Sequence, residues 1–146
     1  MTKPWIENCS MHAIMVGNHY DPGQNSMLIQ IVDPGVFPPE PKYKFNEVWK
    51  FYFLDAEDSD IDKYGEDSLI GDMQARLLVG LLNRALIENI NVIVHCHAGF
   101  CRSGAVTEVG VMMGFTDTKK FRSPNMRVKH KLMGILGYLY TNEEQI

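Results

Sequence analysis

The sequence has few cysteines and no long apolar stretch. No apolar run approaches the roughly 20 residues that a membrane-spanning helix needs, and residues 1–11 lack the apolar core of a secretory signal peptide. Three cysteines are an odd number and form no disulfide framework. These absences argue against a membrane protein and a disulfide-stapled secreted domain, so we expect a protein of the reducing cytoplasm.

A basic excess, internal repeats and low-complexity segments are missing as well. Lys and Arg number 14 and Asp and Glu 18, which gives a net charge of −4 and argues against a general nucleic-acid binder. Apolar residues make up 45% of the chain, which is ordinary for a globular protein and enough to fill a core. The length indicates one domain over residues 1–146.

Residues 91–113, NVIVHCHAGFCRSGAVTEVGVMM, carry the clearest chemical pattern in the chain. Residues 92–94 are an apolar run short enough for a buried strand, and from Ser103 onward small and aliphatic residues indicate a helix. A strand, a tight loop and a helix form an anion site, because the loop N–H groups and the positive helix end converge. The His and Cys residues in 95–101 have no second ligand cluster at zinc-finger spacing, so we expect no metal and no cofactor.

Each polar residue of this loop has a chemical reason to be there. Cys96 begins the loop, and a thiol that faces a helix N-terminus and an arginine is readily converted to the thiolate, the form that attacks. Arg102 ends the loop with a fork of donors that fits two phosphate oxygens. Gly99 lets the backbone turn close to a ligand. Ser103 can donate to the cysteine sulfur, and His95 can hold loop carbonyls.

The pattern HCxxGxxRS at residues 95–103 resembles the active-site loop of cysteine-based protein phosphatases, especially the small dual-specificity and tyrosine phosphatase type. This resemblance implies hydrolysis of phosphotyrosine, phosphoserine or phosphothreonine through a phospho-cysteine intermediate. Cys96 would be the nucleophile, Ser103 would assist the thiolate, and His95 would order the loop. The phosphate would be bound by the Arg102 side chain and by backbone N–H groups of His97, Ala98, Gly99, Phe100, Cys101 and Arg102.

The resemblance also implies a carboxylic acid that protonates the leaving oxygen and then activates water. In the dual-specificity class, this aspartate lies on a loop after the strand that precedes the long helix. Residues 53–55, Phe-Leu-Asp, resemble the Phe-x-Asp found there in several members and favour Asp55, whereas another alignment makes Asp58 the acid. Both stay open. The separation from Cys96 is longer than usual for the class and implies an insertion around residues 61–66.

Cys101 directly precedes Arg102 and has two interpretations. The pattern Cys-x4-Cys-Arg-Ser is similar to that of low-molecular-weight tyrosine phosphatases, and this resemblance implies that Cys101 pairs with Cys96 on oxidation. Cys101 can equally pack as a small apolar residue. The sequence leaves both interpretations open.

The basic stretch 119–131 holds six of the fourteen Lys and Arg residues and no acid. It is either a solvated helix face or a rim that attracts an anionic substrate. Residues 123–125, Ser-Pro-Asn, resemble the start of the final helix in phage and bacterial phosphatase-like proteins, where Pro-Asn leads into Val-x-x-x-Leu, as Val128 and Leu132 follow here. A phage-encoded protein of this kind would act in the host cytoplasm.

The apolar patterns predict an α/β fold. Strands are expected at residues 11–16, 27–32, 45–54 and 92–94, and helices at 71–88, 103–113 and 125–140. They would form a single domain with a central, mostly parallel sheet of four or five strands and helices on both faces. The bulky run 48–53 suits a strand covered on both faces. The loop would lie beyond the carboxyl end of a central strand, where ligands of such sheets bind.

Two other functions stay open. One is a phosphate-recognising pseudophosphatase without a working acid, against which the joint presence of Cys96, Arg102 and Ser103 counts. The other is an RNA 5′-phosphatase of the same fold, which the basic stretch would suit. The net negative charge and the lack of an aromatic stacking platform make a nucleic-acid partner unfavourable. We therefore expect a phosphorylated protein or peptide as partner, and no membrane.

Overall fold

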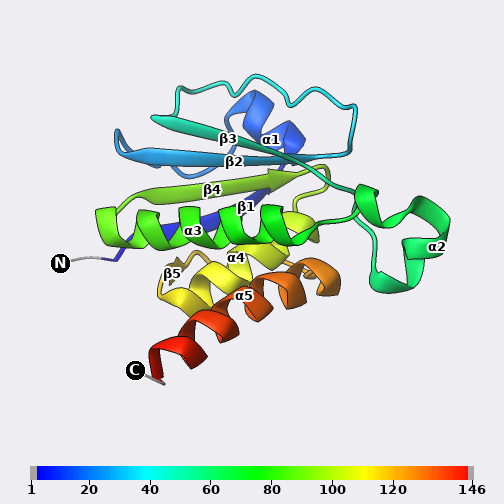
Figure 1. Ribbon diagram of the computed structural model, residues 1–146. Helices are drawn as coiled ribbons and strands as arrows, with labels where there is room; N and C mark the ends of the chain where they lie inside the picture. The colour runs from blue at the N-terminus through cyan, green and yellow to red at the C-terminus, as the bar shows by residue number, and fades with distance from the viewer. Residues whose placement is uncertain (1–2, 145–146) are drawn as a thin grey trace.

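A computed structural model describes residues 3–144, with side chains described for residues 3–137 (Figure 1). Its centre is a five-stranded sheet in which every neighbouring pair is parallel, in the order β3-β2-β4-β1-β5. The strands are β1 (Trp5–Ser10), β2 (Ser26–Val32), β3 (Glu47–Tyr52), β4 (Asn91–Cys96) and β5 (Thr116–Asp117). The predicted α/β fold is confirmed, with β4 as the middle strand.

Three long helices cover one face of the sheet (Figure 1). These are α3 (Asp72–Glu88), α4 (Arg102–Met113) and α5 (Met126–Glu144). The short helix α1 (Met11–Val16) covers part of the other face. Side chains alternate along each strand, so Ile29 packs in the core beneath the long helices and Leu28 packs with Ile14 of α1. Helices therefore lie on both faces, as predicted, but unequally. Within the described residues, no helix combines the length and apolarity needed to cross a membrane.

The first predicted strand, residues 11–16, was wrong, because this segment is helix α1. The first strand is instead β1, which pairs with β4 from Ile6 opposite Val92 to Ser10 opposite Cys96. The hydroxyl of Ser10 accepts a hydrogen bond from Ala13 N at 3.0 Å and caps the helix, which ends at Gly17 with φ +77°. A segment of six residues is too short to show a period, so these caps were the more informative signal.

The prediction that the third strand is covered on both faces was also wrong. β3 lies at the edge of the sheet and pairs only with β2. Phe51 and Trp49 pack towards α3, but Val48 and Tyr52 on the other face are 40% and 42% exposed. An edge position gives a strand one sheet neighbour, and composition alone does not show which strand takes it.

The segment between β3 and α3 projects from the carboxyl end of the sheet. It contains η1 (Asp58–Asp60), α2 (Ile61–Tyr64) and η2 (Glu66–Ser68), which lie to the right in Figure 1. The predicted insertion around residues 61–66 falls on these turns. The chain then enters α3, whose predicted extent of residues 71–88 matches the observed helix. Tyr64 of α2 is thereby brought back to the end of the sheet where β4 terminates.

Candidate active site

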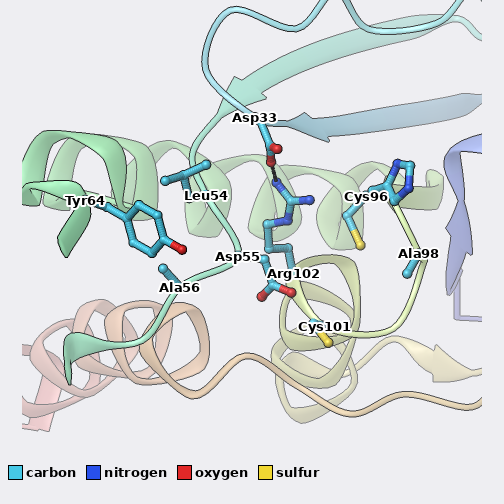
Figure 2. A pocket seen from close by; sticks show the side chains of 10 residues that line it. Asp33, Leu54, Asp55, Ala56, Tyr64, Cys96, Ala98, Cys101 and Arg102 are labelled. Carbon is cyan, nitrogen blue, oxygen red and sulfur yellow. Dashed lines mark hydrogen bonds and ion pairs between the residues drawn. The ribbon is translucent and has the colours of Figure 1, made fainter. Parts of the chain in front are cut away.

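A cavity of about 280 Å³ lies at the carboxyl end of the sheet, where β4 gives way to α4 (Figure 2). Four segments line it: Asp33 after β2, residues 54–56 after β3, Tyr64 of α2, and the loop from Cys96 to Arg102. Of this loop, the cavity touches Cys96, His97, Ala98, Cys101 and Arg102. The fold therefore gathers the predicted loop, one predicted acid and four residues to which the sequence assigned no role: Asp33, Leu54, Ala56 and Tyr64.

The sulfur of Cys96 lies among hydrogen-bond donors. Cys96 is the last residue of β4 and is almost fully buried. Its Sγ is 3.2 Å from Ser103 Oγ and accepts a hydrogen bond from Gly99 N at 3.3 Å. Arg102 and Ser103 begin α4, whose N-terminus faces the loop. The Ser103 hydroxyl, the Gly99 N–H group and the first turn of α4 therefore lie around this sulfur.

Gly99 is fixed by its contact with the end of β1. Its φ is +87°, and a Cβ there would lie 2.5 Å from Cys9 C and 2.5 Å from Ser10 N. A side chain would therefore collide with backbone as well as strain the turn. Buried Asn8 of β1 donates from Nδ2 to Gly99 O at 2.8 Å and to Phe121 O at 2.9 Å. The sequence does not indicate this role of Asn8, because the two carbonyl groups that it contacts lie 91 and 113 residues further along the chain.

Arg102 presents one edge of its guanidinium to bonded partners and leaves the other edge free of them. Its side chain is 5% exposed. Nη1 donates to Asp33 Oδ1 at 2.7 Å and to Phe53 O at 2.9 Å. Nε is buried and has no hydrogen-bond partner in the part of the chain that the structure describes. Such a group is costly unless a ligand satisfies it, and an anion with two oxygens fits the fork.

The two candidate acids occupy different environments. Asp55 lines the cavity, and its Oδ1 accepts a hydrogen bond from Asn125 Nδ2 at 2.7 Å. Asp58 lies outside the cavity lining, and its Oδ1 accepts from Arg127 Nη1 at 2.6 Å. Only Asp55 is therefore placed next to the loop, whereas Asp58 ties the segment after β3 to α5.

Asn125 joins three parts of the site. Its Oδ1 accepts from Val128 N at 3.0 Å and caps α5, while its backbone N donates to Cys101 O at 3.0 Å. Its Nδ2 contacts both Asp55 and Ala56 O. The sequence indicated the Pro-Asn pair as the start of a helix. The structure shows in addition that Asn125 contacts the carboxylate of Asp55.

His95 lies behind the loop and is fully buried. Its Nδ1 is 3.4 Å from Cys96 O, a long contact with the loop backbone. Burial lowers the pKa of His95 to about 4, although the contact with Cys96 O opposes this shift and the charge of Arg102 adds to it. The imidazole is therefore neutral at physiological pH and serves as a fixed polar group.

The three cysteines are free thiols. Burial is the largest cause that raises the pKa of Cys101, and the neighbouring Asp55 carboxylate raises it further. Burial, with the charge of Glu7, raises the pKa of Cys9 to about 12. Cys101 shares the cavity with Cys96, whereas Cys9 packs in the core beneath α1.

The basic stretch 119–131 is largely neutralised by acidic side chains. Five of its six cations are in ion pairs: Lys120–Glu7, Arg122–Asp117, Arg127–Asp58, Lys129–Glu108 and Lys131–Asp72. This pattern favours the solvated helix face over a cationic rim that attracts substrate. Among residues 3–137, whose side chains are described, no group of three or more His, Cys, Asp or Glu side chains could hold a metal ion.

Fold and site together define a parallel α/β domain with a buried cysteine and a buried arginine at the two ends of one loop. No known family model matches the chain, and no curated protein matches it. Among solved structures, it is similar to OH1, a tyrosine phosphatase of the Orf virus described as having distinct structural features and triple substrate specificity. The TM-score is 0.47 at 20% identity, over 75% of this chain and 56% of that chain. This chain thus spans just over half the length of that structure.

Proposed function

We propose that this protein is a cysteine-dependent phosphatase that hydrolyses phosphate monoesters on proteins or peptides. The observation that carries the proposal is the pairing, in one cavity, of a sulfur held by two donors and a buried arginine whose Nε has no partner among the described residues. The Cys96 sulfur can act as a nucleophile, and the Arg102 guanidinium can bind two phosphate oxygens. Their positions at the two ends of one loop suit attack on a bound phosphoryl group.

In the first step, Arg102 and the N–H groups of residues 97–102 hold the phosphate oxygens. The Cys96 thiolate attacks phosphorus, so a P–S bond forms as the ester P–O bond breaks. Asp55 gives its proton to the leaving oxygen, which departs as an alcohol or phenol. The loop stabilises the charge on the transferring group with donors already in place, a role that metal ions fill in other phosphoryl transferases.

In the second step, Asp55 takes a proton from water, whose oxygen attacks the phospho-cysteine. The P–S bond breaks, inorganic phosphate leaves, and the thiolate returns. The Ser103 hydroxyl, 3.2 Å from the sulfur, donates to that thiolate as it departs. Asn125 holds the Asp55 carboxylate at the cavity throughout. Asp58 is committed to Arg127 and takes no part in this mechanism.

The cavity also bears on the substrate class. Opposite the loop, Leu54, Ala56 and Tyr64 form a wall of largely apolar side chains. This wall suits the carbon part of a phosphorylated amino-acid side chain, and the ring of Tyr64 favours an aryl ester. The pairing of the basic stretch leaves little free positive charge for a nucleic-acid backbone.

The test is hydrolysis of p-nitrophenyl phosphate by the wild-type protein and by Cys96→Ser. We expect turnover in the wild type, and in the variant its loss with retained folding and retained binding of inorganic phosphate. Cys9→Ala, which changes a core thiol outside the cavity, is the matched control and should stay active. Turnover near the wild-type level in Cys96→Ser would overturn the proposal.

A further inference from the structure

Both hydrogens of Arg102 Nη1 are taken by acceptors from two different strands. One acceptor is Asp33 Oδ1, directly after β2, and the other is Phe53 O, directly after β3. The opposite edge of the guanidinium, Nε and Nη2, donates no hydrogen bond to any described residue. Because the group is planar, two acceptors on one nitrogen fix where the opposite edge points.

We propose that Asp33 is a positioning residue, which orients Arg102 so that its Nε–Nη2 edge binds the phosphoryl group. The inference rests on the proposed function. Figure 2 shows Asp33 above the guanidinium and Cys96 beside it. Asp33 acts through Arg102, by holding the nitrogen that faces away from the reacting atoms.

The place of Asp33 follows from the sheet. β2 is the neighbour of β4, with Gln30 opposite His95, so the residue after β2 lies beside the loop that leaves β4. The turn after β2 holds the Asp33 backbone, because Val36 N donates to Asp33 O at 3.0 Å. Asp33 is therefore presented by a strand end and a hydrogen-bonded turn, which makes its carboxylate a stable reference point for Arg102.

The ion pair joins a buried guanidinium to a partly exposed carboxylate. The Asp33 side chain is 50% exposed and the Arg102 side chain 5%, so solvent screens the contribution of Asp33 to the folding free energy. A carboxylate that lines the cavity also repels a phosphate dianion, which is a cost for ground-state binding. That cost is offset if the aligned fork stabilises the transition state more than the bound substrate.

Substitution of Asp33 should therefore lower kcat while leaving KM nearly unchanged. In Asp33→Ala, Arg102 keeps its charge and loses its alignment, while the repulsion of the dianion is relieved. We expect kcat on an aryl phosphate to fall roughly ten- to hundredfold, the scale of a small misplacement in an active site. KM and the inhibition constant for inorganic phosphate should change by less than about threefold.

Two further variants sharpen the test. Asp33→Asn keeps an acceptor oxygen for Nη1 and should recover much of the kcat lost in Asp33→Ala. Asp72→Ala is the matched control, because it removes an exposed aspartate whose ion pair with Lys131 lies outside the cavity. It should leave kcat unchanged. Thermal melting of all variants measures any effect on folding.

Several results would overturn the inference. One is a kcat for Asp33→Ala within about twofold of the wild type. Another is a loss of activity that is equal in Asp33→Ala and Asp33→Asn and follows their loss of folded protein. An active wild type with an unaffected Asp33→Ala would refute this inference alone, whereas a wild type without turnover would refute the proposed function and this inference with it.

Discussion

The side-chain amide of Asn125 donates a hydrogen bond to Asp55 Oδ1 at 2.7 Å. The same nitrogen donates to Ala56 O at 3.1 Å, and the amide oxygen caps α5 through Val128 N. The start of the last helix thus holds the loop after β3 against the cavity. This contact selects Asp55 over Asp58 as the acid that we propose.

Asp55→Asn should slow turnover most for substrates with poor leaving groups. An alkyl phosphate needs a proton on its leaving oxygen, whereas an acidic phenol departs without one. We expect a kcat loss of roughly a hundredfold or more on alkyl phosphates and a much smaller loss on p-nitrophenyl phosphate. Rates across a series of leaving groups measure this dependence. Asp58→Asn is the control, and finding the pattern there would transfer the role of acid to Asp58.

Tyr64→Ala should reduce the preference for aryl esters. Its ring lines the cavity next to Ala56, so its removal deprives a phosphotyrosine ring of an aromatic contact. We expect kcat/KM to fall by roughly tenfold on a phosphotyrosine peptide and to change little on a phosphoserine peptide of the same sequence. Tyr64→Phe, which keeps the ring, should behave like the wild type. An equal fall on both peptides would assign Tyr64 a role unrelated to the ring.

Protonation of His95 should destabilise the protein in mild acid. Its pKa is lowered from 6.5 to about 4 in the folded state, so between these values the unfolded chain binds the proton and the folded chain does not. Stability therefore rises with pH through this window, by roughly 3 kcal/mol at most from this group. The free energy of unfolding, measured with urea at several pH values between 4 and 6.5, should depend less steeply on pH in His95→Asn than in the wild type. Identical slopes would contradict the assignment.

Cys101 should protect Cys96 from irreversible oxidation. Peroxide converts the Cys96 thiolate to a sulfenic acid, and attack by the Cys101 thiolate would form a disulfide and release water. The pKa of Cys101 is raised, so its thiolate fraction and the rate of capture should increase with pH. We expect dithiothreitol to restore activity after peroxide in the wild type.

In Cys101→Ser, this recovery should be largely lost, with activity expressed relative to the untreated variant. Mass spectrometry should then find Cys96 as a sulfinic or sulfonic acid. Cys9→Ser is the control, since a pKa raised to about 12 leaves almost no thiolate at Cys9 near neutral pH. Full recovery of Cys101→Ser under the same treatment would support the alternative that Cys101 packs as a small apolar residue.

The sequence by itself determined the loop at residues 95–103 and the elements that flank it. Residues 95–103 are contiguous, so covalent spacing places Cys96, Gly99 and Arg102 around one point once a strand precedes and a helix follows. The apolar stripe of α3 likewise repeats over enough residues to show its period. Patterns of this kind depend only on residues that are close in the sequence, so they can be recognised without knowing how the rest of the chain folds.

Only the tertiary structure decided which distant side chains complete the site. Asp33 reaches Arg102 across 69 residues, and Asp55 reaches Asn125 across 70. Each meeting depends on the strand order and register that bring the ends of β2, β3 and β4 to one edge. The prediction of the first strand at residues 11–16 was wrong for a related reason. Two adjacent segments of six residues are too short to show a period, and pairing with β4 selects the first as the strand.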